Sequence, residues 1–112
     1  MLNLKPGDMV KFDIINKKCT QEGFSTGGYG SLHDELDIYQ TIDIESYPSC
    51  NDFKGNTSTV KHDSYAMILK KIGRPWKINQ VDDRWADYDV YEVLTTKFQR
   101  RHIFRYNLQK LF

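Results

Sequence analysis

The sequence predicts an all-β domain of five or six strands, with a long acidic and glycine-rich insertion after the first strand. Three short β-type runs separated by turn residues lie within residues 64–112. Six Phe, seven Tyr and two Trp supply large buried areas and favour strands. Four of the seven glycines fall between Gly23 and Gly30, where no periodic pattern survives. At 112 residues, the chain is expected to form one domain.

The first strand is expected over residues 9–14, because apolar residues alternate there with Lys11 and Asp13. Pro6 and Gly7 precede it and predict a turn, since proline fixes φ and glycine accepts positive φ. One face of this strand is therefore expected to be buried and the other solvated.

The insertion is expected to cover about residues 16–59. Residues 16–30 predict a loop, and residues 32–36 predict a single helical turn capped by Ser31. Residues 38–44 alternate well enough for a strand, and residues 48–58 are rich in turn formers.

The C-terminal half predicts the remaining strands. Residues 65–72 are apolar on both faces, which indicates a central strand that ends at Gly73. Trp85 is expected on a loop after the acidic interruption at residues 82–84. Residues 88–94 and 98–104 predict a hairpin joined by residues 95–97, and residues 106–108 predict a short helical turn.

Several of these segments resemble parts of SH3-like small barrels. Pro6-Gly7-Asp8-Met9-Val10 resembles their opening strand, and residues 66–69 with the glycine turn resemble a middle strand. Residues 91–94 and 101–104, followed by a short turn through Leu108, resemble the closing pair. The pattern is similar to short uncharacterised proteins of tailed phages, including marine ones, that carry such a barrel. It covers residues 4–15 and 60–112, and it implies binding of peptide, protein or nucleic acid rather than catalysis.

Charge is distributed unevenly along the chain, although the net charge is only +1. Residues 19–53 hold seven acidic residues and no Lys or Arg, so the remainder carries a net charge of +8. Two hypotheses follow for the acidic insertion. It either folds over the barrel and neutralises a basic face, or projects to bind a basic partner.

A basic and aromatic cluster near the C-terminus forms the first candidate site. No acidic residue lies within residues 95–112, and the candidate binding residues there are Lys97, Arg100, Arg101, Arg105 and Tyr106. Arginines can contact phosphates while exposed rings stack on bases, which would give a nucleic-acid surface. The alternative is an edge strand whose charges keep it from aggregating.

A second candidate site surrounds the glycine turn. Arg74, Trp76, Trp85 and Tyr88 bring together the aromatic side chains that line grooves for proline-rich peptides. The structural alternative is that Trp76 plugs one end of the barrel, Trp85 covers a loop and Arg74 stacks on an indole ring.

Catalytic and metal sites are not predicted. His33, Asp34, Glu35, Asp37, His62 and Asp63 lack any established metal-ligand spacing, and no phosphate-binding loop is present. Whether Cys19 and Cys50 pair stays open. No cofactor and no enzyme activity are expected. The absence of a secretory leader and of a long apolar run predicts a cytoplasmic protein that does not enter a membrane.

We therefore expect a non-catalytic protein-interaction module, either a small phage-type structural protein or a host-directed accessory factor. The alternative is a nucleic-acid-binding small barrel that uses the basic C-terminal strand. A homo-oligomer is compatible with both, since an exposed edge strand favours self-association. If the protein comes from a phage, the host cytoplasm or the virion is its expected location.

Overall fold

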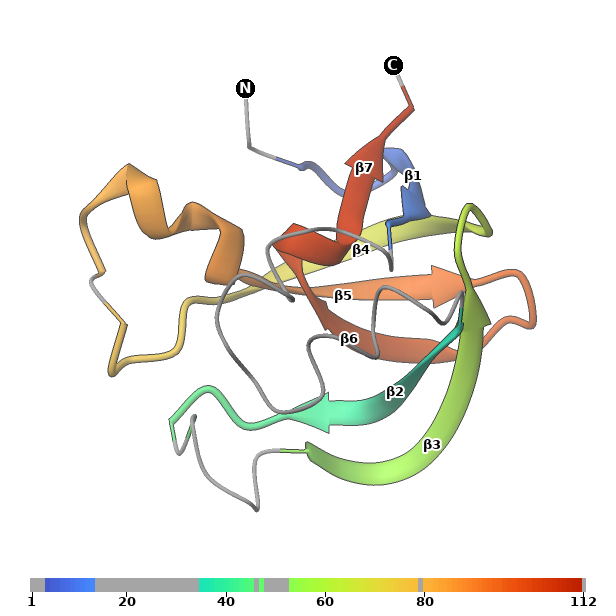
Figure 1. The fold of residues 1–112 in the computed structure, drawn as a ribbon, viewed down its shortest axis with the longest axis horizontal. Helices are drawn as coiled ribbons and strands as arrows, with labels where there is room; N and C mark the ends of the chain where they lie inside the picture. The colour runs from blue at the N-terminus through green and yellow to red at the C-terminus, as the bar shows by residue number, and fades with distance from the viewer. Residues whose placement is uncertain (1–3, 14–34, 46, 48–52, 79, 112) are drawn as a thin grey trace.

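Seven antiparallel strands form one sheet in the computed structural model, which describes residues 4–13, 35–45, 47, 53–78 and 80–111 (Figure 1). In chain order the strands are β1 (Met9–Phe12), β2 (Glu35–Ile42), β3 (Phe53–Lys61), β4 (Tyr65–Gly73), β5 (Val90–Thr95), β6 (Arg100–Phe104) and β7 (Leu108–Lys110). Two short 3-10 helices, η1 (Asp83–Tyr88) and η2 (Arg105–Asn107), precede β5 and β7. The predicted all-β class is confirmed.

The strand order is β3-β2-β6-β5-β4-β1-β7, and the sheet is not closed. Strands β4, β5 and β6 form a meander, while β1 pairs with both β4 and β7. The hairpin β2–β3 lies between β1 and β4 in sequence, yet joins the sheet beside β6. The expected number of five or six strands is therefore wrong, because the described residues alone form seven.

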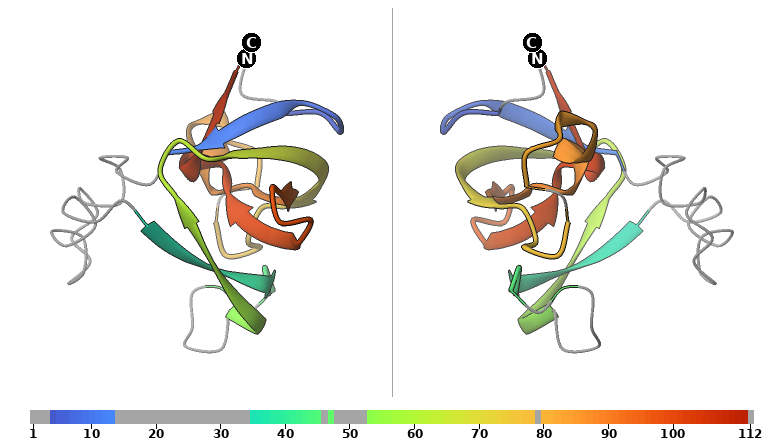
Figure 2. Two further views of the ribbon diagram at one scale, coloured as in Figure 1. Left: turned by 90° about the vertical axis from the view of Figure 1, so that its right-hand side faces the viewer. Right: turned by 90° about the vertical axis from the view of Figure 1, so that its left-hand side faces the viewer.

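The sheet curls over a shared core (Figure 2). Phe12 of β1, Val60 of β3 and Leu108 of β7 belong to one buried cluster, although β3 and β7 lie at opposite ends of the strand order. A flat sheet could not bring those ends to one cluster, so curvature is required for the core to form. A smaller cluster at one end of β5 contains Ile42, Val90 and Phe104.

Three local predictions are wrong. Residues 53–58 were expected to form turns but belong to β3, where Thr57 and Thr59 pair with Tyr39 and Asp37 of β2. Glu35 begins β2 rather than completing a helical turn, and residues 32–34 lie outside the described part. Trp85 lies in η1. The helical turn near residue 106 is confirmed as η2, and the loop at 16–30 and both cysteines lie outside the described residues.

Strand β6 is an interior strand between β2 and β5, so the prediction that it forms a charged sheet edge is wrong. The edges are β3 and β7. The central strand predicted over residues 65–72 is confirmed, because β4 lies between β5 and β1. Within the part of the chain that the structure describes, no helix has the length and apolar character needed to cross a membrane.

Candidate binding surface

The nine predicted binding residues do not form one site, because the fold sends them to opposite ends of β5. The segment of residues 74–89, here called the excursion, precedes β5 and carries Arg74, Trp76, Trp85 and Tyr88. Arg105 and Tyr106 lie at the same end, since the rings of Tyr88 and Tyr106 are 5.7 Å apart. Lys97 lies in the turn that follows β5, and Arg100 begins β6 directly after that turn.

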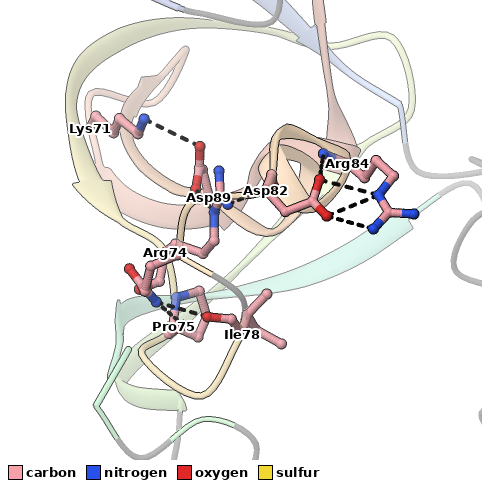
Figure 3. Close-up of polar contacts among 8 residues, drawn as sticks. Lys71, Arg74, Pro75, Ile78, Asp82, Arg84 and Asp89 are labelled. Atoms are coloured by element: carbon pink, nitrogen blue, oxygen red, sulfur yellow. Dashed lines mark hydrogen bonds and ion pairs between the residues drawn. The ribbon is translucent and has the colours of Figure 1, made fainter.

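Arg74 is a structural anchor of the excursion (Figure 3). Its side chain is only 9% exposed, and Nε donates a hydrogen bond to Oδ1 of Asp89 at 2.8 Å. Lys71 Nζ lies 3.2 Å from the other carboxylate oxygen of Asp89, and Nη1 of Arg74 donates to the backbone oxygen of Asp82. The hydrogen bond to Asp89 raises the pKa of the Arg74 guanidinium above its usual value. Arg74 therefore braces the chain between β4 and β5.

Two further contacts fix the excursion. The side-chain amide nitrogen of Gln80 donates to the backbone oxygens of Pro75 and Ile78, at 2.7 and 3.0 Å. Asp82 caps η1 by accepting from the backbone N–H of Arg84, whose side chain also binds it (Figure 3). The pKa of Asp82 is lowered mainly by the hydrogen bonds from the Arg84 side chain, and to a smaller extent by the hydrogen bond from the Arg84 backbone N–H.

The aromatic residues at this end divide into buried and exposed ones. Tyr88 is buried, and Tyr106 stacks on Phe104 with ring centroids 5.3 Å apart. Trp76 is 61% exposed, with its indole N–H donating to the backbone oxygen of Glu45, and Trp85 is 40% exposed. Only the two tryptophans thus present a substantial aromatic surface to solvent here.

Two of the predicted basic residues are engaged within the fold. Arg101 is 8% exposed, and its guanidinium donates to Ser58 Oγ of β3 and to the backbone oxygen of Arg100. Arg105 donates to the backbone oxygen of Leu108 at 2.6 Å. Lys97 and Arg100 are exposed and form no ion pair with any residue in the described ranges. Of the four basic candidates in the predicted C-terminal cluster, Arg101 and Arg105 thus bind other parts of the fold, and Lys97 and Arg100 remain as exposed cations near the β5–β6 turn.

Thr95 organises the β5–β6 turn. Its backbone oxygen accepts from the N–H of Phe98 at 2.9 Å, and its hydroxyl oxygen accepts from the N–H groups of Lys97 and Gln99, both at 3.3 Å. Gln99 in turn accepts a hydrogen bond from Ser58 Oγ at 2.7 Å. The turn is therefore held against β3 rather than projecting freely.

Phe98 occupies the most demanding position of this turn. Its φ is +60°, in the left-handed region where glycine or asparagine is normally found, and its side chain is 84% exposed. That backbone costs about 1–2 kcal/mol for an L-residue. A phenyl ring in water gains no burial energy to offset this cost. A bulky aromatic residue with both disadvantages is a candidate binding residue.

Two hollows flank the turn and share Thr95 and Thr96. The first, here called the turn groove, has a volume of about 410 Å³ and is lined by Glu35, Thr59, Val60, Lys61, Ser64, Thr95, Thr96, Lys97 and Gln99. The second, here called the methionine cleft, has a volume of about 220 Å³ and is lined by Met9, Tyr65, Ala66, Met67, Leu94, Thr95 and Thr96. Thr95 and Thr96 line both hollows, Lys97 lines the turn groove, and Phe98 follows Lys97 in the same turn. This end combines cations, hydroxyl groups and exposed apolar side chains.

A third feature lies on the seam between β2 and β6, whose strands meet at the single register pair Tyr39 and His102. His102 is 9% exposed, and its Nδ1 accepts the backbone N–H of Ile42 at 3.1 Å, which requires a neutral ring protonated on Nε2. Burial lowers the pKa of His102 and outweighs the Glu92 carboxylate 3.6 Å from Nε2. A cavity of about 100 Å³ adjoins this seam.

Comparison with protein-family models, with curated proteins and with solved structures finds no match to this chain. Among the described residues, no three His, Cys, Asp or Glu side chains gather closely enough to hold a metal ion.

The basic and aromatic cluster predicted from the sequence contained Phe98, but Phe98 was not among the candidate binding residues, and Tyr65, Met9 and Met67 were missed as surface residues. A usable signal was present at residues 96–98, because the hairpin connection Thr-Lys-Phe contains none of the residues that turns normally use. The methionines gave no signal, since Met9 and Met67 fit an ordinary strand pattern equally well.

Proposed function

We propose that this protein is a non-catalytic interaction module, built on an SH3-like small barrel with an insertion after its first strand, which binds a protein partner at the β5–β6 turn. The observation that carries the proposal is Phe98, 84% exposed at a φ of +60° on a turn fixed by hydrogen bonds. An exposed aromatic ring on a turn whose backbone is held by hydrogen bonds supplies contact area at low conformational cost.

The strand arrangement supports the barrel part of the proposal. The segments that resemble SH3-like barrels correspond to β1, to β4 with Gly73, to the hairpin β5–β6 and to the short helix η2. These elements are neighbours in one sheet, whereas β2–β3 joins it at the far side of β6. This is consistent with an insertion placed on a small barrel. A phage-type structural or accessory role, in the host cytoplasm or virion, and a homo-oligomeric form are part of the same proposal.

Selection from a random-peptide library on the folded protein tests the binding function. We expect clones that bind the wild type and lose about tenfold or more in affinity for Phe98→Gly, since one buried aromatic anchor is worth at least 1.4 kcal/mol. Trp76→Ser is the matched control, because it removes an exposed aromatic residue at the opposite end. If no clone binds, or if Trp76→Ser abolishes binding while Phe98→Gly does not, the proposal is wrong.

Nucleic-acid binding is the second candidate function, favoured by Lys97 and Arg100 beside the exposed rings of Phe98 and Tyr65. It predicts that a random oligonucleotide binds at a permissive salt concentration of ~50 mM and dissociates as salt rises. The double variant Lys97→Gln/Arg100→Gln should abolish that binding. Arg101 and Arg105 are excluded from the test because both support the fold. Absence of binding at low salt removes this candidate.

A further inference from the structure

A row of side chains crosses four strands beside the β5–β6 turn. Met9 of β1 is paired in register with Met67 of β4, Met67 with Leu94 of β5, and Leu94 with Arg100 of β6. Directly paired residues of neighbouring strands project to the same face of a sheet. The structure therefore carries an apolar strip three strands wide that ends in an arginine.

The strip lies on the outer face of the sheet. Its sequence neighbours Val10, Ala66 and Val93 are buried at 0–2% exposure and belong to the core. Met9, by contrast, is 39% exposed, and Met67 and Leu94 are half-buried. Tyr65, 53% exposed, adds its ring to the methionine cleft that the strip forms. Thioether side chains adapt to the shape of an incoming apolar group, which suits a binding surface.

Three cations lie beside the strip or line the neighbouring turn groove. Arg100 is paired in register with Leu94 at the end of the strip, and Lys97 and Lys61 line the neighbouring turn groove. None of these three cations has an ion-pair partner in the part of the chain that the structure describes. Glu35 is the carboxylate that lines the turn groove. A ligand that spans both hollows therefore meets an apolar surface followed by positive charge.

We propose that this surface binds an extended acidic protein segment, with an aliphatic side chain in the methionine cleft and carboxylates on Arg100 and Lys97. The inference rests on the proposed function and names its class of partner. Met9, Met67 and Leu94 contact an aliphatic group well and offer no hydrogen bond to a nucleic-acid base, while Tyr65 is the one aromatic residue among the described residues that line the cleft.

Four synthetic probes test this assignment by fluorescence anisotropy: an acidic peptide with one leucine, the same peptide with serine in place of leucine, a neutral peptide that keeps the leucine, and oligo(dT). We expect the acidic leucine peptide to bind most tightly. Loss of either the leucine or the acidic residues should weaken binding about tenfold, because each contact is worth about 1.4 kcal/mol or more.

Variants locate the binding. Arg100→Gln and Met9→Gln each change an exposed side chain and should weaken the acidic leucine peptide about tenfold. Arg84→Gln is the control, because Arg84 is also an exposed arginine but lies at the opposite end of β5, and this variant should bind normally. Thermal unfolding of each variant checks that the fold is retained.

The outcomes separate this inference from the function on which it rests. If peptides from the random library bind at Phe98 but the acidic leucine peptide does not, the module stands and the partner class is wrong. Equal binding of the neutral peptide, or full binding by Arg100→Gln, also overturns the inference. If oligo(dT) is the only probe that binds, and Arg100→Gln abolishes its binding, then the ligand of this surface is a nucleic acid and not a protein segment. If none of the probes and no library clone binds, both proposals fail.

Discussion

Phe98 combines a left-handed backbone with an exposed ring, and the two can be separated by one substitution. Phe98→Gly removes about 1–2 kcal/mol of backbone strain. It adds about 0.5–1 kcal/mol of chain entropy in the unfolded state. We expect the free energy of unfolding to rise by about 0.5–1 kcal/mol, measured by urea denaturation. The stability should therefore increase while peptide affinity decreases.

Lys97→Gly is the control for that experiment. Lys97 precedes Phe98 in the same turn and does not have a positive φ, so glycine relieves no strain there. The substitution keeps the hydrogen bond from the backbone N–H of residue 97 to the hydroxyl oxygen of Thr95. Its expected result is a loss of stability of about 0.5–1 kcal/mol. If both glycine variants change stability in the same direction, strain at Phe98 is not the cause.

At the scale of elements, the Arg74–Asp89 pair fixes the excursion to the sheet. The side chains are 9% and 5% exposed, so replacement of Asp89 leaves a buried guanidinium without its counter-charge. We expect Asp89→Asn to lower the free energy of unfolding by about 3–5 kcal/mol, measured by chemical denaturation. Arg84→Ala removes the exposed pair with Asp82 and serves as the control. Similar losses in both variants would contradict a bracing role for the buried pair.

Sequence predicted the elements that bury one regular apolar face and failed where another cause decides. Strands β1, β4 and β5 show apolar alternation or continuous apolar runs, and all were predicted. Strand β3 was not predicted, because the residues that pair with β2 there, Thr57, Ser58 and Thr59, show no apolar alternation. A strand stabilised mainly by backbone hydrogen bonds and hydroxyl groups leaves little periodic signal.

The candidate site was predictable only in part, because long-range contacts decide which basic side chains are exposed. Arg100 and Arg101 are adjacent and chemically identical, yet one is exposed and the other buried beside Ser58 of a strand 43 residues away. The burial of Arg101 depends on β2–β3 joining the sheet beside β6, which brings Ser58 to Arg101, and no local pattern encodes this long-range contact. The sequence identified the C-terminal region as basic, but only the fold selects Lys97 and Arg100 from it.

At the scale of the whole molecule, His102 links the hairpin β2–β3 to the rest of the sheet. Its lowered pKa means that the unfolded chain, with an ordinary value of about 6.5, binds a proton more readily than the folded protein. The free energy of unfolding should therefore fall as pH drops below about 6.5, by at most about 1.4 kcal/mol per pH unit. The loss should level off below the folded pKa.

Denaturation between about pH 5.5 and 7.5, where ordinary carboxylates titrate little, measures this effect. His102→Asn keeps an acceptor for the N–H of Ile42 but cannot titrate, so it should flatten the pH dependence. His62→Gln is the control, because His62 lies near Asp13 and Asp63 rather than on the β2–β6 seam. A slope that persists in His102→Asn would exclude His102 as its source.

The pairing of β1 with β7 determines how the molecule responds to tension. These strands are antiparallel, and the start of β1 lies beside the end of β7, with Leu111 N–H donating to Met9 O (Figure 1). Tension between Leu4 and Leu111 would peel the two strands apart one hydrogen bond at a time. Tension between Asp13 and Leu111 would load the same bonds together. Optical-tweezer measurements should find a lower rupture force in the first geometry, and equal forces would show that another part of the sheet bears the load.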